Sequence, residues 1–158
     1  KGCIFYAVKG EGAFVRSLDS EASRRIGVDG IRDSAAAVFC ESVEKAHAAH
    51  DDHARLASLL GVKAAPYRID SQCKYAAVAR GDASIYLRLP SKKGYQEKIW
   101  DHAAGVMVVT EAGGRVTDVR GRPLNFSVGR ELKENLGVIV TNSHLHEVVL
   151  KAADQVLA

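Results

Sequence analysis

The most informative stretch of the sequence reads Tyr95-Gln-Glu-Lys-Ile-Trp-Asp-His-Ala-Ala-Gly-Val-Met-Val-Val-Thr-Glu-Ala-Gly-Gly114. From Ile99 to Ala112 the residues are almost all apolar or small. A surface helix would carry a polar face, so this composition predicts a helix that is buried on most of its sides. The two glycines at 113 and 114 are typical of a helix C-terminus. We therefore expect the fold to be organised around this helix.

Asp101 is the charged residue near the start of the expected helix. A carboxylate is favoured there by the positive end of the helix dipole. Its oxygens can cap the first backbone N–H groups, with Trp100 simply part of the core. The same position also suits a cation ligand at the rim of a cleft. Spacing alone leaves both roles open.

Short apolar runs alternate with helical patterns over the rest of the chain. Strands are expected at 3–8, 13–18, 36–40, 66–69, 83–89, 115–118 and 136–141, the first two as a hairpin. Helices are expected at about 51–60, at 72–80, and from about 143 to the end. Residues 19–34 are polar and charged and are expected to form an exposed loop or a short irregular insertion. This alternation predicts a layered α/β domain, with one mixed β-sheet flanked by helices on both faces.

Length and composition set modest limits. A chain of 158 residues suits one domain with its own core. A net charge of +3 is compatible with a phosphorylated ligand, but is too small to indicate nucleic-acid binding. No run approaches the length of a membrane span. The chain begins with Lys1 directly before an expected strand, which indicates a piece of a longer protein.

The three cysteines, Cys3, Cys40 and Cys73, are odd in number and far apart. They form no C-x-x-C pair, so neither a disulfide framework nor a zinc knuckle is indicated. A reducing compartment is expected on these grounds, with the cytoplasm as the predicted location and an organelle as the alternative.

Three histidines, His47, His50 and His53, are spaced at i, i+3 and i+6, with Asp51 and Asp52 among them. Such a cluster can indicate a metal site. On one helix, however, residues i and i+6 point well apart, so a three-histidine site would need a bend. The alternative is a loop followed by a helix, whose first turn is stabilised by the two aspartates.

Ser71 and Lys74 lie at the start of the helix expected over 72–80. Ser71 is a natural N-cap residue. A helix N-terminus with a nearby lysine is also an anion site. Lys74 falls in the first turn, where a cation opposes the helix dipole, and a bound phosphate would explain this placement. Both interpretations remain open from the residues alone.

Arg88 closes the strand expected over 83–89 and alternates with Tyr86. In this alternation Arg88 is expected on the side of the strand that faces the cleft. The arginine fork suits bidentate phosphate recognition. The alternative is a surface arginine on an edge strand.

Several segments together resemble a known group of enzymes. Trp100–Gly105 and Thr110–Gly114 resemble the second signature of the inositol-monophosphatase superfamily of magnesium-dependent, lithium-sensitive phosphatases. Asp70–Tyr75, Tyr86–Pro90 and Tyr95–Asp101 resemble, more narrowly, the 3′(2′),5′-bisphosphate nucleotidases of fungi and plants. The blocks occur in the right order over nearly the whole chain, which makes the resemblance more specific than one motif.

The resemblance implies an activity and a set of site residues. Enzymes of this kind remove the 3′-phosphate of 3′-phosphoadenosine 5′-phosphate, a by-product of sulfate assimilation, and the products are AMP and phosphate. The implied cofactor is Mg2+, held in part by Asp101. Ser71, Lys74 and Arg88 are implied to bind the phosphate that is not cleaved, and His47 to contact the nucleotide.

The superfamily also uses an upstream glutamate and a motif of the type Asp-Pro-Ile-Asp-Gly-Thr for most of its metal ligands, and this sequence contains no such motif. Residues 1–158 are therefore expected to form a single α/β domain that resembles the carboxyl-terminal lobe of a two-domain phosphatase, without a complete catalytic centre. Expected partners are the bisphosphate nucleotide and the absent amino-terminal lobe, with no nucleic acid and no membrane. Two other functions stay open: a phosphatase of inositol phosphates or 3′-phosphoadenylyl sulfate, and a non-catalytic nucleotide-binding or assembly domain.

Overall fold

The computed structural model describes residues 2–43, 50–90 and 95–158. The strands are β1 (Cys3–Val8), β2 (Gly12–Ser17), β3 (Ser23–Ile26), β4 (Phe39–Glu41), β5 (Tyr67–Arg68), β6 (Ile85–Arg88), β7 (Arg115–Thr117) and β8 (Val138–Thr141). The α-helices are α1 (His50–Leu59), α2 (Cys73–Arg80), α3 (Ala103–Glu111) and α4 (His146–Leu157). Short 3-10 helices within these described residues are η1 (Ser34–Ala36) and η3 (Ile99–Asp101).

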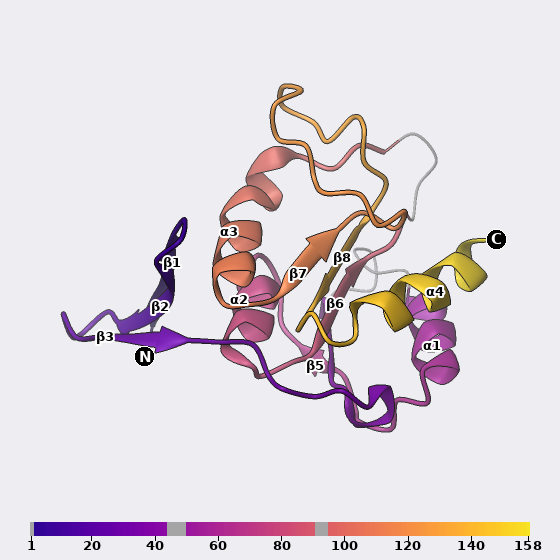
Figure 1. Ribbon diagram of the computed structural model, residues 1–158, viewed down its shortest axis with the longest axis horizontal. Helices are drawn as coiled ribbons and strands as arrows, with labels where there is room; N and C mark the ends of the chain where they lie inside the picture. Colours follow the sequence, from indigo (N-terminus) through magenta and orange to yellow (C-terminus); the bar gives the residue numbers. More distant parts are fainter. Residues whose placement is uncertain (1, 44–49, 91–94) are drawn as a thin grey trace.

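The larger sheet has five strands in the order β5-β4-β6-β8-β7. Strand β4 runs parallel to β5 and β6, whereas β8 is antiparallel to β6 and β7. Helices α2 and α3 lie on one side of this sheet, and α1 and α4 lie on the other (Figure 1). The expected mixed sheet flanked by helices is therefore confirmed.

A second, three-stranded antiparallel sheet was not expected from the sequence. Its order is β1-β2-β3, and it protrudes from the body of the molecule (Figure 1). The hairpin of β1 and β2 was predicted correctly, but the exposed loop predicted for residues 19–34 is wrong at residues 23–26, where β3 pairs with β2. Within β3 only Ile26 is buried, and the strand therefore lacks the apolar alternation by which strands are recognised.

Side chains of the central strands alternate between two hydrophobic cores, as the strand period requires. Ile85 and Leu87 of β6 pack toward α1 and α4, together with Ile139 of β8. Tyr86, Val138 and Val140 point to the opposite face, which α2 and α3 cover. Arg88 shares the face of Tyr86, because the two lie two residues apart on one strand.

Helix α3 is more exposed than its sequence indicated. Its buried residues are Gly105, Val108 and Val109, whereas Met107 is 38% exposed. The prediction of a helix buried on most sides is therefore wrong for the residues described, because α2, β7 and the β1–β2 hairpin contact α3 but leave Ala103, Ala104, Met107 and Thr110 exposed. The predicted stop is confirmed, since α3 ends at Glu111, Ala112 is its C-cap, and Gly113 then adopts a φ of 90°.

The segment before β4 also differs from expectation. The strand predicted over 36–40 begins only at Phe39, because residues 34–36 form the turn η1. The carboxylate of Asp33 caps this turn by accepting a hydrogen bond from the backbone N–H of Ala35, at 3.0 Å. A local side-chain cap of this kind competes with the extended conformation.

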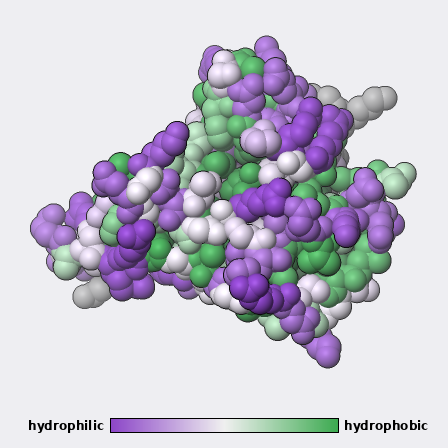
Figure 2. Space-filling view, viewed as in Figure 1, coloured by the Kyte–Doolittle hydropathy of each residue, from purple (hydrophilic) through white to green (hydrophobic). Residues whose placement is uncertain are grey.

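The surface mixes polar and apolar residues. Figure 2 shows apolar side chains over α1 and α4, where Leu59, Val148 and Leu157 are among the exposed large hydrophobic residues. Among residues 2–43, 50–90 and 95–158, no helix has the length and apolar character needed to cross a bilayer.

Candidate functional site

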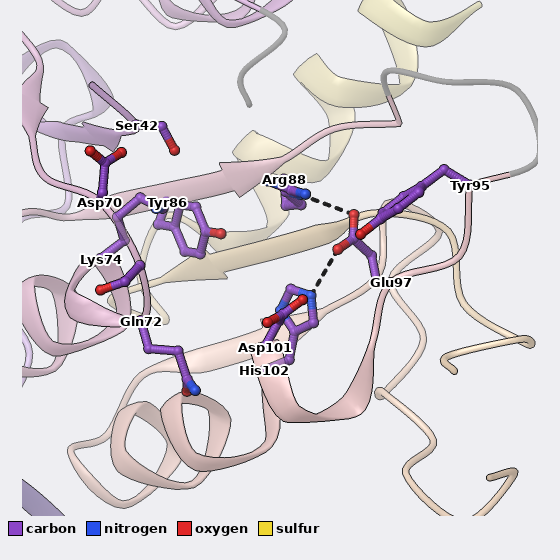
Figure 3. A pocket seen from close by; sticks show the side chains of 11 residues that line it. Ser42, Asp70, Gln72, Lys74, Tyr86, Arg88, Tyr95, Glu97, Asp101 and His102 are labelled. Carbon is purple, nitrogen blue, oxygen red and sulfur yellow. Dashed lines mark hydrogen bonds and ion pairs between the residues drawn. The ribbon is translucent and has the colours of Figure 1, made fainter. Parts of the chain in front are cut away.

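A cavity of about 800 Å³ opens at the carboxyl ends of the three parallel strands of the larger sheet. Ser42 follows β4, Asp70 follows β5, and Arg88 ends β6. Ligands of open α/β sheets bind at this edge of the sheet. The side chains around the cavity are shown in Figure 3. They belong to Ser42, Asp70, Ser71, Gln72, Lys74, Tyr86, Arg88, Tyr95, Glu97, Asp101 and His102.

Four of the five site residues suggested by the sequence line this one cavity: Ser71, Lys74, Arg88 and Asp101. They come from separate segments, namely the start of α2, the end of β6 and the turn before α3. The fifth residue, His47, lies outside the described residues, and its contact with a nucleotide stays a prediction.

Lys74 is a buried cation in the first turn of α2, as its sequence position indicated. Lys74 is only 5% exposed, and its ammonium lies 5.4 Å from the centre of the Tyr86 ring. Within the described part of the chain, no carboxylate forms an ion pair with it. Burial lowers the pKa of this ammonium below its ordinary value, against the opposing attraction of Asp70. The cavity thus holds a desolvated positive charge that an anion would stabilise.

Ser71 has an unusual backbone conformation at the wall of the cavity. Its φ is 61°, in the left-handed region that residues other than glycine seldom adopt. Its Oγ accepts a weak hydrogen bond from the N–H of Cys73 at 3.4 Å, but Gln72, not Ser71, occupies the N-cap position of α2. The simple N-cap interpretation of Ser71 is therefore wrong. Strained residues of this kind cluster at functional sites.

Arg88 is half-buried on a central strand, since β6 lies between β4 and β8. The alternative of a surface arginine on an edge strand is therefore wrong. Its Nε donates a hydrogen bond to Oε1 of Glu97 at 3.0 Å. A guanidinium carries five N–H donors, so Arg88 can bind Glu97 and a phosphate oxygen at the same time.

Glu97 connects Arg88 to His102 and was missed in the sequence. Its second oxygen, Oε2, lies 3.0 Å from Nε2 of His102. Burial alone would raise the pKa of Glu97, but the hydrogen bond with His102 and the charge of Arg88 outweigh this, so the pKa lies below its ordinary value. An ionised carboxylate only accepts hydrogen bonds, and Nε2 of His102 must therefore carry a proton.

His102 continues this network into the core. The hydroxyl of Tyr75 lies 2.7 Å from Nδ1 of His102, and both residues are almost fully buried. Because Nε2 donates to Glu97, Nδ1 of a neutral His102 accepts a hydrogen bond from the Tyr75 hydroxyl. Burial raises the pKa of Tyr75 well above its ordinary value, so this hydroxyl remains a donor. A continuous chain of hydrogen bonds therefore runs from Tyr75 to Arg88.

Asp101 lies in the turn η3, two residues before α3, with its side chain exposed at the cavity. Its carboxylate makes no capping hydrogen bond to the residues the structure describes, which removes support for a purely capping role. Gln72 holds the turn from both sides. Its Nε2 donates to the carbonyl of Trp100 at 2.9 Å, and its Oε1 accepts from the N–H of Gly105 at 2.9 Å.

The donor chemistry of Asp101 fits a hard divalent cation. Carboxylate oxygens suit Mg2+, which keeps several waters and takes few protein ligands. Glu97 is already engaged by Arg88 and His102. Residues 2–43, 50–90 and 95–158 contain no group of three or more His, Cys, Asp or Glu side chains suited to a metal ion. Asp101 can thus serve as one ligand of a metal whose other ligands are not among these residues.

The histidine cluster is only partly described. Helix α1 begins at His50, close to the predicted start at Asp51. His53 is buried, with Nδ1 3.8 Å from Oε2 of Glu41, and both line a second cavity of about 420 Å³. His47 lies outside the described residues, so the three-histidine site stays a prediction.

Comparison with known proteins adds the family context. A model of the inositol monophosphatase family matches residues 1–158. The 3′(2′),5′-bisphosphate nucleotidase of Emericella nidulans is 50% identical over 159 residues, which cover 99% of this chain and 45% of the relative. The protein of the same name from Oryza sativa is 51% identical over 156 residues, covering 99% of this chain and 43% of the relative. The chain thus spans less than half the length of these curated relatives.

Solved structures support the fold independently. An inositol monophosphatase from Anabaena (Nostoc) sp. PCC 7120 superposes with a TM-score of 0.69 at 23% identity, covering 96% of this chain and 54% of that one. The IMPase of Thermotoga maritima gives a TM-score of 0.68 at 23% identity, covering 97% and 52%. At this level of identity the likeness concerns the fold alone.

Proposed function

Because this chain belongs to the inositol monophosphatase family, we propose that it forms the nucleotide-binding lobe of a 3′(2′),5′-bisphosphate nucleotidase. The reaction is hydrolysis of the 3′-phosphate of 3′-phosphoadenosine 5′-phosphate to AMP and phosphate. The names of relatives at 50% and 51% identity support this substrate class. Those relatives are more than twice as long as the chain, so we assign the activity to a protein of their length.

The observation that carries this proposal is the pair of cations in the cavity. Lys74 is buried and has no carboxylate partner among the described residues, and Arg88 lies on the same wall. Hydrogen bonds from charged donors to phosphate are among the stronger ones in proteins. A ligand with two phosphates can leave one on Lys74 and Arg88 while the other reaches Asp101, which lines the same cavity.

Each residue then has a defined part. Lys74, Arg88 and the strained Ser71 bind the phosphate that is not cleaved, and His47 contacts the nucleotide. This remote binding orients the reacting phosphate, and correct orientation alone can supply a large share of a rate enhancement. The ammonium of Lys74 is already desolvated in the free protein, so phosphate binding carries no further cost for removing its hydration shell.

We propose Mg2+ as the metal and Asp101 as one of its ligands. A bound divalent cation supplies Lewis-acid polarisation of the phosphoryl group and lowers the pKa of a coordinated water. The chain's own contribution is to fix the carboxylate of Asp101 at the cavity, through the two hydrogen bonds that Gln72 makes to the backbone around it. The remaining ligands are assigned to residues beyond those of this sequence.

Phosphate release tests this proposal. A protein of the relatives' length that carries this sequence should hydrolyse 3′-phosphoadenosine 5′-phosphate in the presence of Mg2+, faster than it hydrolyses inositol 1-phosphate or 3′-phosphoadenylyl sulfate. The 158-residue chain alone should release no phosphate, because one carboxylate makes a weak magnesium site. A preference for inositol phosphate would replace the proposed substrate class. Nucleotide binding without any hydrolysis by the longer protein would favour a non-catalytic binding domain.

A further inference from the structure

We infer that Glu97 is a positioning residue that fixes the guanidinium of Arg88 and the turn that carries Asp101 relative to each other. Its two carboxylate oxygens are used separately, with Oε1 accepting from Nε of Arg88 and Oε2 accepting from Nε2 of His102, each at 3.0 Å. One carboxylate thus joins the end of β6 to the residue directly after Asp101. The inference deepens the proposed function and rests on it.

The hydrogen bond between Arg88 and Glu97 fixes the orientation of the Arg88 side chain. An arginine side chain has many rotamers, and holding it in one of them costs conformational entropy. The bond from Nε to Glu97 fixes the plane of the guanidinium at the cavity wall, where Arg88 and Glu97 lie side by side in Figure 3. A guanidinium that is fixed before the ligand binds loses less freedom on binding.

The hydrogen bond between Glu97 and His102 holds the turn before α3. His102 is only 2% exposed, and its other ring nitrogen lies 2.7 Å from the hydroxyl of Tyr75 on α2. The imidazole is therefore clamped between Tyr75 and Glu97. Gln72 clamps the same turn through the backbone of Trp100 and Gly105. Asp101 has no side-chain hydrogen bond to the described residues, so these contacts of its neighbours determine its place.

Packing supports a rigid connection between α2 and α3. A Cβ atom at Gly105 would lie 2.3 Å from Cγ of Tyr75, so only glycine permits this approach of the two helices. The Tyr75 ring also packs edge-on against Tyr86, with centroids 5.1 Å apart. The network from Tyr75 to Arg88 therefore has little room to shift.

The sign of the expected effect separates positioning from simple electrostatics. Glu97 is a negative charge at a cavity that we propose to bind anions. Removing a like charge should strengthen anion binding if charge were the only factor. If Glu97 acts by positioning Arg88, its removal weakens binding instead, and it does so only while Arg88 is present.

A double-mutant cycle tests this inference. Adenosine 3′,5′-bisphosphate is titrated calorimetrically into the protein and into the Glu97→Ala, Arg88→Ala and doubly substituted variants. We expect Glu97→Ala to weaken binding about ten-fold in the parent, as loss of a charge-assisted contact would. In the Arg88→Ala background it should cause no further loss, because contacting residues are energetically coupled. The matched control is Glu147→Ala, which removes a carboxylate on α4 that accepts a hydrogen bond from Arg115 of β7 at 2.6 Å, and it should leave nucleotide affinity unchanged.

Two outcomes would overturn the inference. Unchanged or tighter binding by Glu97→Ala in the parent would show that Glu97 acts only as a charge. An equal loss in both backgrounds would show a general structural role, which melting temperatures would also register. Glu97→Gln should restore binding toward the parent, because an amide can accept from Arg88 and donate to the other tautomer of His102.

A ligand-free measurement keeps this inference separate from the proposed function. If the parent binds no bisphosphate nucleotide, the proposed function fails. The positioning of Arg88 by Glu97 is then tested on its own, by hydrogen exchange of the Arg88 Nε–H in nitrogen-15 spectra. A fixed arginine predicts slow exchange in the parent and fast exchange in Glu97→Ala. Fast exchange in both would overturn the positioning role.

Discussion

The ammonium of Lys74 lies 5.4 Å from the centre of the Tyr86 ring, inside a cavity where the described residues provide no carboxylate that pairs with it. Burial of an unpaired cation is costly, and the fold bears this cost at the start of α2, where the helix dipole also opposes a positive charge. A lysine in this position is better explained by a ligand than by stability.

Lys74→Met should separate these two roles. Methionine keeps much of the side-chain volume without the charge, so the free energy of unfolding should stay the same or rise. Affinity for adenosine 3′,5′-bisphosphate should fall about ten-fold or more, since hydrogen bonds to charged groups contribute about 1.5–3 kcal/mol. Denaturant unfolding and calorimetry measure the two quantities. Lys151→Met, an exposed substitution on α4, is the control and should leave affinity unchanged.

Asp101→Asn tests the metal ligand. The carboxylate makes no hydrogen bond to the residues described, so the melting temperature of the protein should change little. In a protein of the relatives' length, phosphate release should fall strongly at every Mg2+ concentration, because an amide is a weaker ligand for a hard cation. Asp154→Asn on α4 is the matched control. A lowered melting temperature with full specific activity would mean that Asp101 is structural.

Gly105→Ala tests the contact between α2 and α3. The added methyl group would lie 2.3 Å from Tyr75, and overpacking of this kind costs about 1–3 kcal/mol of stability. Gly27→Ala is the comparison, because its Cβ would meet only a carbonyl oxygen at 3.6 Å. Equal unfolding midpoints in urea for the two variants would show that the helices can move apart.

His146 should make stability depend on pH. It is fully buried, with its ring nitrogens 2.9 Å from the hydroxyls of Thr117 and Thr141, and burial lowers its pKa from 6.5 to about 4. The unfolded chain therefore binds the proton more readily than the folded chain. Stability from this group is full above pH 6.5 and is lost as pH falls toward 4, by about 2–3 kcal/mol.

Thermal unfolding of the protein and of His146→Gln between pH 7 and pH 5 measures this effect as a difference of slopes. The other titrating groups contribute equally to both proteins. An imidazole titration near pH 6.5 for His146 in NMR spectra of the folded protein would contradict the buried neutral state, even if the substituted protein unfolds.

Much of this architecture could be predicted from the sequence. The α2 helix, the last helix and the strands β6 and β8 follow from apolar runs and periodicity, because each buries a continuous apolar face. Strand β3 was missed since only Ile26 of its four residues is buried. The exposure of α3 was missed as well, because small residues such as Ala103 and Ala104 can lie equally well inside or outside.

Among the residues of the site, too, some could be predicted from the sequence and others could not. Lys74 was recognisable as a cation at the unfavourable end of a helix, and Arg88 through its alternation with Tyr86. Glu97 and Gln72 were not, because their roles depend on partners that only the tertiary structure brings near. The left-handed backbone of Ser71 is likewise invisible in a sequence, since serine seldom adopts it.

Calorimetric titration of the 158-residue protein with adenosine 3′,5′-bisphosphate tests the central claim most directly. The account predicts saturable binding at one site, weakened in both Lys74→Ala and Arg88→Ala but not in Lys151→Ala. Absence of binding, or equal affinity in the parent and in the two cavity variants, would contradict it.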